Sequence, residues 1–294
     1  MRAESVRSPE DEGRLVAIGD TALFVVERGN GYPIIVLHGG PGLDHRMWGS
    51  YLDPLADRYR LVLVDQRSQG RSEGAPEETW TLERMAADVT GLAEALGLRR
   101  YATLGHSYGA FVVLQHAVDF PGHAAQTIVS SGIPASRFLA DVERNLETFE
   151  PIELRDQVAA SWEREKTVRT REECDELLHE QLPFHFADPR DPRIALFERE
   201  IEGGLSSPDV IRTFANAEYG GIDVEARLGE IPQAVLVLAG RHDRTCSVEA
   251  AEAIARGVPN AELVVFEESG HMTYVEENAR YLAIVQDFLE RHGR

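Results

Sequence analysis

Short runs of apolar residues recur along the chain, and each run ends in glycine or polar residues. The runs are PIIVLHGGPG at 33–42, YRLVLVDQRSQGRS at 59–72, YATLGHSYG at 101–109, QTIVSSG at 126–132, AVLVLAGRHD at 234–243 and AELVVFEESGH at 261–271. Continuous apolar runs of this length predict strands that are buried on both faces, as in a parallel sheet. Residues 13–29 instead alternate apolar and polar positions around Gly-Asp, which predicts a hairpin.

Helical patterns lie between these runs. Residues 82–96 carry apolar side chains at helical spacing, which predicts a helix with one face toward a core. Residues 108–118, 248–256 and 275–290 are also predicted to be helical. Strands that alternate with helices indicate an α/β fold with a mostly parallel, doubly wound sheet.

The alternation stops between the runs at 126–132 and 234–243. This stretch is rich in charge and prolines, and Leu139, Val142, Leu146 and Phe149 predict one of several helices in it. We therefore expect two parts. Residues 1–134 and 231–294 form the core domain, and residues 135–230 form a helical cap inserted over the sheet.

The charge and the cysteine content limit the partners and the compartment. The net charge is -20, from 50 acidic and 30 basic residues, and such a surface repels nucleic acid and anionic membranes. Solubility explains this charge most simply, and attraction of a cationic substrate is the alternative. The 2 cysteines argue against a disulfide framework. The start of the chain lacks a signal-peptide pattern, and no apolar run approaches the ~18 residues of a membrane span. We expect a cytoplasmic protein.

Three chemically active residues follow predicted strands, where a parallel sheet collects its active groups. Ser107 lies between Gly105 and Gly109, and Asp243 and His271 follow later strands. A serine hydroxyl needs a base to act as a nucleophile, and an imidazole held by a carboxylate supplies one. The order Ser, Asp, His is that of the nucleophile elbow of α/β hydrolases. A serine at this position favours acyl transfer. The competing interpretations are a helix cap for Ser107, a turn residue for Asp243 and a loop histidine for His271.

An acyl-transfer site also needs hydrogen-bond donors for the oxyanion. The backbone N–H of Tyr108, at the start of the predicted helix, is one candidate. The N–H of Gly40, in the HGGPG loop, is the other. The sequence shows no metal-ligand spacing around His179 or His185, no Walker loop and no dinucleotide fingerprint, so we expect neither a metal nor a cofactor.

At these residues the chain resembles the prolyl iminopeptidase family. The similar blocks are HGGPG at 38–42, DQRSQGRS at 65–72, GHSYGA at 105–110 and ESGHMTYVEENARYL at 268–282. The resemblance implies an α/β-hydrolase fold with an inserted helical cap. It also implies that Ser107, Asp243 and His271 form a catalytic triad that removes N-terminal proline, or another small residue, from short peptides through an acyl-enzyme.

The resemblance also suggests substrate-binding residues. Members of the family hold the free amine with cap glutamates. The resemblance therefore implies Glu218 as the first candidate, followed by Glu202 and Glu198. Gly39 of the glycine loop is a further expected substrate-binding residue. The sequence departs from the family at Ser68, where a glycine is usual, and at Tyr108, where tryptophan is frequent.

Two other functions remain open from the sequence. A serine esterase or amidase that acts on small acyl substrates without a free amine would have the same core. A ligand-binding receptor with little turnover is the second alternative, although a full triad beside an oxyanion loop argues against it.

Overall fold

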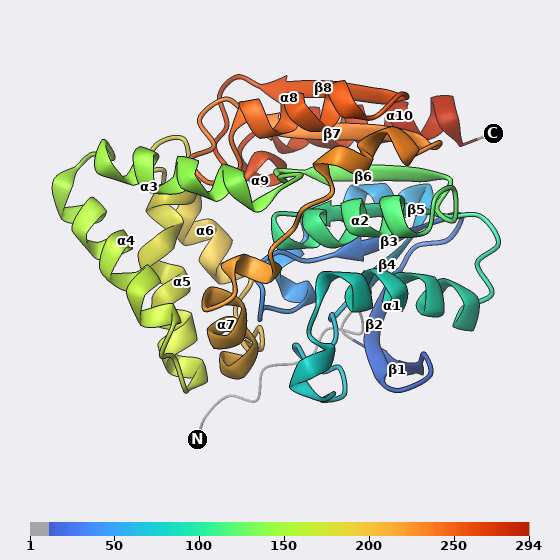
Figure 1. Cartoon of the computed structure of the whole chain (residues 1–294), viewed down its shortest axis with the longest axis horizontal. Helices are drawn as coiled ribbons and strands as arrows, with labels where there is room; N and C mark the ends of the chain where they lie inside the picture. Colours follow the sequence, from blue (N-terminus) through green and yellow to red (C-terminus); the bar gives the residue numbers. More distant parts are fainter. Residues whose placement is uncertain (1–11, 294) are drawn as a thin grey trace.

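The computed structural model describes residues 12–293 and contains one eight-stranded sheet in the order β1-β2-β4-β3-β5-β6-β7-β8 (Figure 1). β1 pairs antiparallel with β2, β2 pairs antiparallel with β4, and every other pair is parallel. The strands are β1 (Arg14–Ala17), β2 (Ala22–Arg28), β3 (Tyr32–Leu37), β4 (Tyr59–Val64), β5 (Ala102–His106), β6 (Gln126–Ser130), β7 (Ala234–Gly240) and β8 (Ala261–Phe266). The predicted fold class and the predicted N-terminal hairpin are therefore confirmed.

Helices cover both faces of the sheet. α1 (Leu82–Ala95), α2 (Tyr108–Asp119) and α8 (Val248–Gly257) pack on one face, and α9 (Thr273–Glu276) and α10 (Asn278–His292) pack on the other. The central strands are buried between these two layers, which explains their continuous apolar runs. The helix predicted over 275–290 is in fact two helices, because Glu277 has non-helical backbone angles between α9 and α10.

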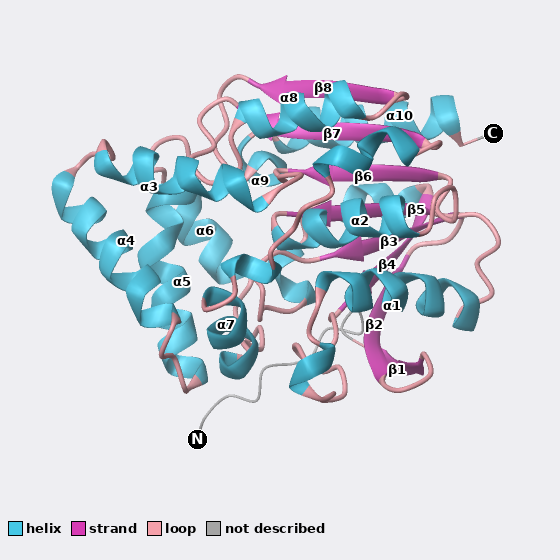
Figure 2. Ribbon diagram, viewed as in Figure 1, coloured by secondary structure: helices cyan, strands magenta, loops and turns pink. Residues whose placement is uncertain are grey.

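Between β6 and β7 the chain leaves the sheet and forms five α-helices, which we call the cap, together with short 3-10 helices. The α-helices are α3 (Ala140–Glu147), α4 (Ile152–Glu165), α5 (Arg171–His185), α6 (Arg193–Glu200) and α7 (Pro208–Ala215). The strand arrows point toward the cap, so it covers the carboxyl ends of the parallel strands (Figure 2). Phe149, predicted on the first of these helices, lies beyond its end, where its ring packs 5.0 Å from that of Phe184.

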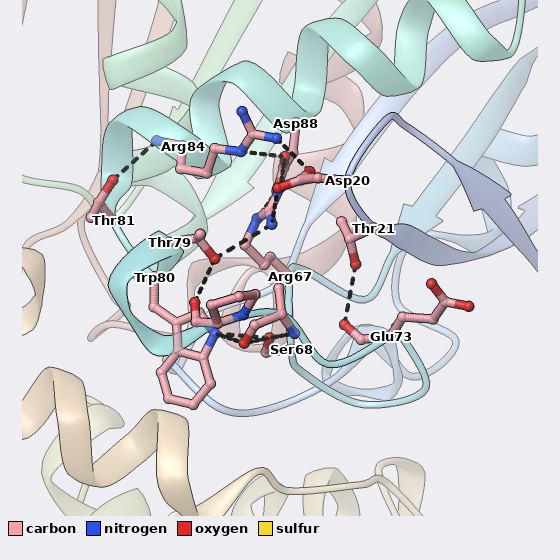
Figure 3. A network of polar contacts seen from close by, with 12 residues as sticks. Asp20, Thr21, Arg67, Ser68, Glu73, Thr79, Trp80, Thr81, Arg84 and Asp88 are labelled. Carbon is pink, nitrogen blue, oxygen red and sulfur yellow. Dashed lines mark hydrogen bonds and ion pairs between the residues drawn. The ribbon is translucent and has the colours of Figure 1, made fainter.

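A buried ion-pair network joins three separate segments on the α1 side of the sheet (Figure 3). Arg67, which follows β4, is fully buried and donates to Asp88 of α1 at 2.8 Å and to Asp20 of the hairpin turn at 3.1 Å. Ser68 has a φ of 61°, a conformation suited to the glycine usual there. Its hydroxyl accepts hydrogen bonds from Ala75 N at 2.9 Å and Trp80 Nε1 at 2.8 Å. These two bonds stabilise the loop conformation although serine replaces the usual glycine.

In the described part of the chain, no helix is both long and apolar enough to cross a membrane. The first residues of the sequence, on which the expectation about a signal peptide rests, lie outside the described residues.

Candidate active site

Ser107 occupies a sharp turn between β5 and α2. Its φ of 53° lies in a region that non-glycine residues rarely adopt. The flanking glycines allow this turn by permitting close backbone approach. A Cβ on Gly105 would lie 2.1 Å from Gly109 O, and a Cβ on Gly109 would lie 2.4 Å from Leu37 O. The two glycines therefore let the turn fold back on itself and bring α2 against β3.

Asp243 and His271 lie in the loops after β7 and β8 and form a buried pair. His271 Nδ1 is 2.8 Å from Asp243 Oδ2, and the carboxylate can only accept, so Nδ1 carries the hydrogen. Asp243 Oδ1 accepts from Thr245 N and Cys246 N, both at 2.8 Å. Burial raises the pKa of Asp243, but His271 and these N–H groups lower it more, so its net pKa lies below the ordinary value. Asp243 is therefore suited to hold the imidazole with Nε2 free.

One cavity of about 630 Å³ lies between the sheet and the cap, and both Ser107 and His271 line it. Among the described residues, no hydrogen bond joins their side chains. Such bonds are often long in the absence of substrate and shorten in the complex. The structure thus brings all three residues to one edge of the sheet, with the hydroxyl and the imidazole facing the same space.

Gly40 and Tyr108 also line this cavity. Neither backbone N–H donates to another group of the described residues, so both remain available as donors. Gly40 has a φ of 111°, which favours glycine. Gly39 does not line the cavity; a Cβ there would lie 2.9 Å from Met47 Cε and 3.2 Å from Ser107 Cβ, so this glycine makes room for both side chains.

The three glutamates suggested by the sequence separate into two places. Glu218 lines the cavity that contains Ser107 and is exposed to solvent. Glu198 and Glu202 instead line an adjoining pocket of about 240 Å³, where Glu198 pairs with His179. Neither of these two glutamates lines the cavity that contains Ser107.

Glu165, at the end of α4, is a carboxylate that the sequence reasoning missed. It lines the main cavity and is only 9% exposed. Its oxygens accept from Gln181 Nε2 and Tyr219 Oη, both at 2.7 Å. No cationic side chain of the described chain forms an ion pair with it. The sequence does carry a signal for it, since Val158, Trp162 and Glu165 follow helical spacing and place a carboxylate on an apolar stripe.

The cap is attached to the His271 loop by a short segment, Phe184–Ala187. His271 N donates to His185 O at 2.7 Å. Arg244 donates to the carbonyls of Phe184, Phe186 and Ala187 at 2.6–3.1 Å. Glu276 bridges the two sides, because it accepts from Ala187 N and from Gly270 N, both at 2.8 Å. We call these contacts the clasp.

His185 is a further polar group that faces the cavity from the clasp. Its ring centroid lies 5.1 Å from that of His271. Burial lowers the pKa of His185 to about 3, so this imidazole is neutral at physiological pH.

Two groups of described residues bring possible metal ligands within 4.8 Å of one another: Asp243 with Cys246 and His271, and Asp44 with His45 and Asp65. Hydrogen bonds within the protein account for both groups. In the second, His45 Nδ1 lies 2.6 Å from Asp65 Oδ1, which also accepts from His45 N.

A parallel sheet with a serine at a strand-to-helix turn, followed along the chain by an aspartate and a histidine, is the arrangement of α/β hydrolases. The sequence model of the alpha/beta hydrolase fold family matches residues 32–278, so the chain belongs to this family.

Relatives confirm the resemblance to proline iminopeptidases. The chain is 29% identical over 274 residues to a proline iminopeptidase from Heyndrickxia coagulans. The alignment covers 90% of this chain and 92% of that protein. Among solved structures, a proline iminopeptidase from Mycobacterium smegmatis has a TM-score of 0.75 at 24% identity and covers 96% and 98% of the two chains. An esterase from Exiguobacterium antarcticum has a TM-score of 0.76 at 22% identity and covers 95% and 100%. These two structures show the shared fold. Family and relatives together support a hydrolase.

Proposed function

We propose that the protein is a serine aminopeptidase that releases an N-terminal residue from short peptides. The observation that carries this proposal is Glu165, a buried carboxylate that faces the cavity of Ser107 and forms no ion pair with a cationic side chain of the described residues. Burying an unpaired charge is costly, and a substrate ammonium group would remove that cost. Relatives named proline iminopeptidase support the same reaction.

The proposed chemistry uses the residues of the sheet edge. His271 accepts the proton of Ser107 as its oxygen attacks the carbonyl carbon, and Asp243 stabilises the resulting imidazolium. The N–H groups of Gly40 and Tyr108 donate to the oxyanion. His271 then gives its proton to the leaving amine, and water hydrolyses the acyl-enzyme by the same steps.

In this proposal the cap recognises the amine. Glu165 binds the ammonium group inside the cavity. Glu218 is exposed and contributes negative charge at the mouth. An α-amino group and the carbonyl next to it are thereby held in one cavity, which selects exopeptidase substrates over internal peptide bonds.

The test compares a free-amine aminoacyl arylamide with its N-acetylated form and with a short-chain aryl ester. Glu165→Gln keeps the shape but removes the charge; its amide oxygen can still accept from Gln181 Nε2, while its amide nitrogen donates to Tyr219 Oη instead of an oxygen accepting there. We expect it to lower kcat/KM for the free amine by about 30-fold or more, the range for breaking a buried charge pair, and to leave the ester unchanged. Glu153→Gln, exposed on the same helix, is the matched control.

Either of two results would contradict the proposal and favour one of the alternatives. Equal cleavage of free and acetylated arylamides would favour the esterase or amidase alternative. No covalent labelling of Ser107 by a fluorophosphonate would favour the ligand-binding receptor.

A further inference from the structure

The size of the cavity points to the side chain of the substrate. A volume of about 630 Å³ lies well inside the range of roughly 300–1,000 Å³ that holds drug-sized ligands. The ring of proline occupies only a small part of such a space. A small N-terminal residue covers little of the cavity wall, which is then left to the rest of the peptide or to water.

The wall of the cavity is mostly apolar, and it comes from both the core and the cap. The core contributes Met47 and Phe111. The cap contributes Val142 and Leu146 from α3, Trp162 from α4 and Leu178 from α5. The polar groups of the lining are the reacting residues with His185 and Thr245 beside His271, Glu165 with its partners, and exposed residues at the mouth such as Glu163 and Lys166.

The proposed function puts the substrate side chain against this wall. Ser107 and Glu165 line the same cavity. If the carbonyl lies at the first and the amine at the second, the carbon between them and its side chain also lie inside. An apolar side chain that fills the space releases water from apolar surface, and one methylene group in such a pocket is worth about 10- to 200-fold in kcat/KM.

We propose that the enzyme prefers N-terminal residues with large apolar side chains, such as phenylalanine, leucine and tryptophan, over proline. This inference rests on the proposed aminopeptidase function and specifies the substrate class of that site.

A substitution at Ala159 of α4 tests directly whether the substrate side chain occupies the cavity. Ala159 lines the cavity, whereas the next residue, Ala160, is exposed and does not. Ala159→Trp should fill part of the cavity, and Ala160→Trp adds the same side chain to the same helix outside it. The pair separates loss of volume from a general effect of tryptophan on α4.

The experiment measures kcat/KM for the free-amine arylamides of Pro, Ala, Leu and Phe, with N-acetyl-Phe as the blocked control. We expect the wild type to cleave the Phe substrate at least about tenfold better than the Pro substrate. Ala159→Trp should reduce Phe cleavage by about tenfold or more and leave Ala cleavage within about threefold. Ala160→Trp should change neither.

The wild-type series alone decides the preference, so the test does not depend on the folding of a variant. Faster cleavage of Pro than of Phe, or equal losses for Ala and Phe substrates in a folded Ala159→Trp protein, would overturn this inference and leave the aminopeptidase proposal standing. Equal cleavage of Phe and N-acetyl-Phe arylamides, or cleavage of none of the free-amine substrates, would overturn the proposed function and this inference with it.

Discussion

At the scale of single residues, the backbone of Ser107 stores strain that glycine would not have. A φ of 53° in a non-glycine residue costs of the order of 1–3 kcal/mol, and the packed turn maintains it. The proposed chemistry explains why a serine is nevertheless present, because the turn raises its hydroxyl into the cavity.

Two substitutions at this position separate strain from chemistry. Ser107→Ala and Ser107→Gly should both lower turnover by several orders of magnitude, since each removes the proposed nucleophile. Ser107→Gly should be more stable than Ser107→Ala by about 1 kcal/mol, because glycine accepts this φ without strain. Urea unfolding and steady-state kinetics measure the two effects. Near-normal turnover in either variant would contradict the mechanism.

In the proposed function, Glu165 makes amine recognition dependent on pH. Burial raises the pKa of Glu165 above its ordinary 4.5, against smaller lowering by Tyr219, Gln181 and Lys166. The carboxylate is charged only above its pKa, so a raised pKa moves the loss of charge to higher pH. The ratio of kcat/KM for a free-amine substrate to that for an ester should therefore fall with decreasing pH already above 4.5. In Glu165→Gln the ratio should not change with pH over this range.

The same shift has a consequence for stability. A carboxyl whose folded-state pKa is raised stabilises the fold when protonated, and this contribution is lost as the pH rises through the folded-state pKa. Glu165→Gln is therefore expected to be at least as stable as the wild type at neutral pH while losing its preference for a free amine. A large loss of stability would assign Glu165 to the structure of the cap.

At the scale of elements, the clasp connects the loop of His271 to the cap. Arg244→Met should remove three hydrogen bonds to the segment Phe184–Ala187 and retain most of the apolar stem. We expect faster hydrogen exchange at Phe186, Ala187 and His271, with a lower kcat, because the His271 N–H is bonded to this segment.

Arg241→Met is the control for this prediction. Arg241 lies in the same loop, but it is exposed and pairs with Glu267 on the surface. Surface pairs contribute about 0–1 kcal/mol, so exchange in the clasp should not change. Unaltered exchange in Arg244→Met would show that other contacts hold the cap.

The elements also show how far the sequence predicts the structure. The strands, α1, α2 and α8 follow from apolar runs and helical stripes, because a sheet covered on both faces needs continuous burial. The Ser107 turn and the positions of Asp243 and His271 follow from chain order. The cap is less predictable, since its helices pack through a few apolar contacts and many ion pairs. The sequence does not tell which face of each cap helix meets the cavity, so it could not show that Glu165 lines the cavity of Ser107 and that Glu198 and Glu202 do not.

At the scale of the whole molecule, the Arg67 network joins the N-terminal hairpin, the loop after β4 and α1. Arg67→Met would leave Asp88 buried without its main partner, since the nearest alternative, Arg84 Nε, lies 3.8 Å away. We expect the free energy of unfolding to fall by about 3–5 kcal/mol. In the double variant Arg67→Met/Asp88→Leu, most of this loss should be recovered. Urea unfolding measures both, and no recovery would mean that the size of the methionine causes the defect.

The contribution of Asp20 to the stability of the network depends on pH. Hydrogen bonds from Arg67 and Arg84 lower the pKa of Asp20 to about 2 from 3.8. Its contribution is present above the unfolded value and is lost as the pH falls through about 2. Because Asp20 is 44% exposed, solvent screening keeps this contribution small.

The cap leaves the sheet after β6 and returns at β7, and these two strands are neighbours. One uninterrupted stretch of coding sequence therefore specifies the cap's share of the cavity wall, while the core's share, with Ser107, Asp243 and His271, is encoded on either side of it. A genetic exchange confined to that stretch would pass on a new substrate preference without altering the reacting groups. The exchanged stretch would still need a segment that Arg244 and Glu276 can bind. The clasp therefore limits which cap sequences the core can accept.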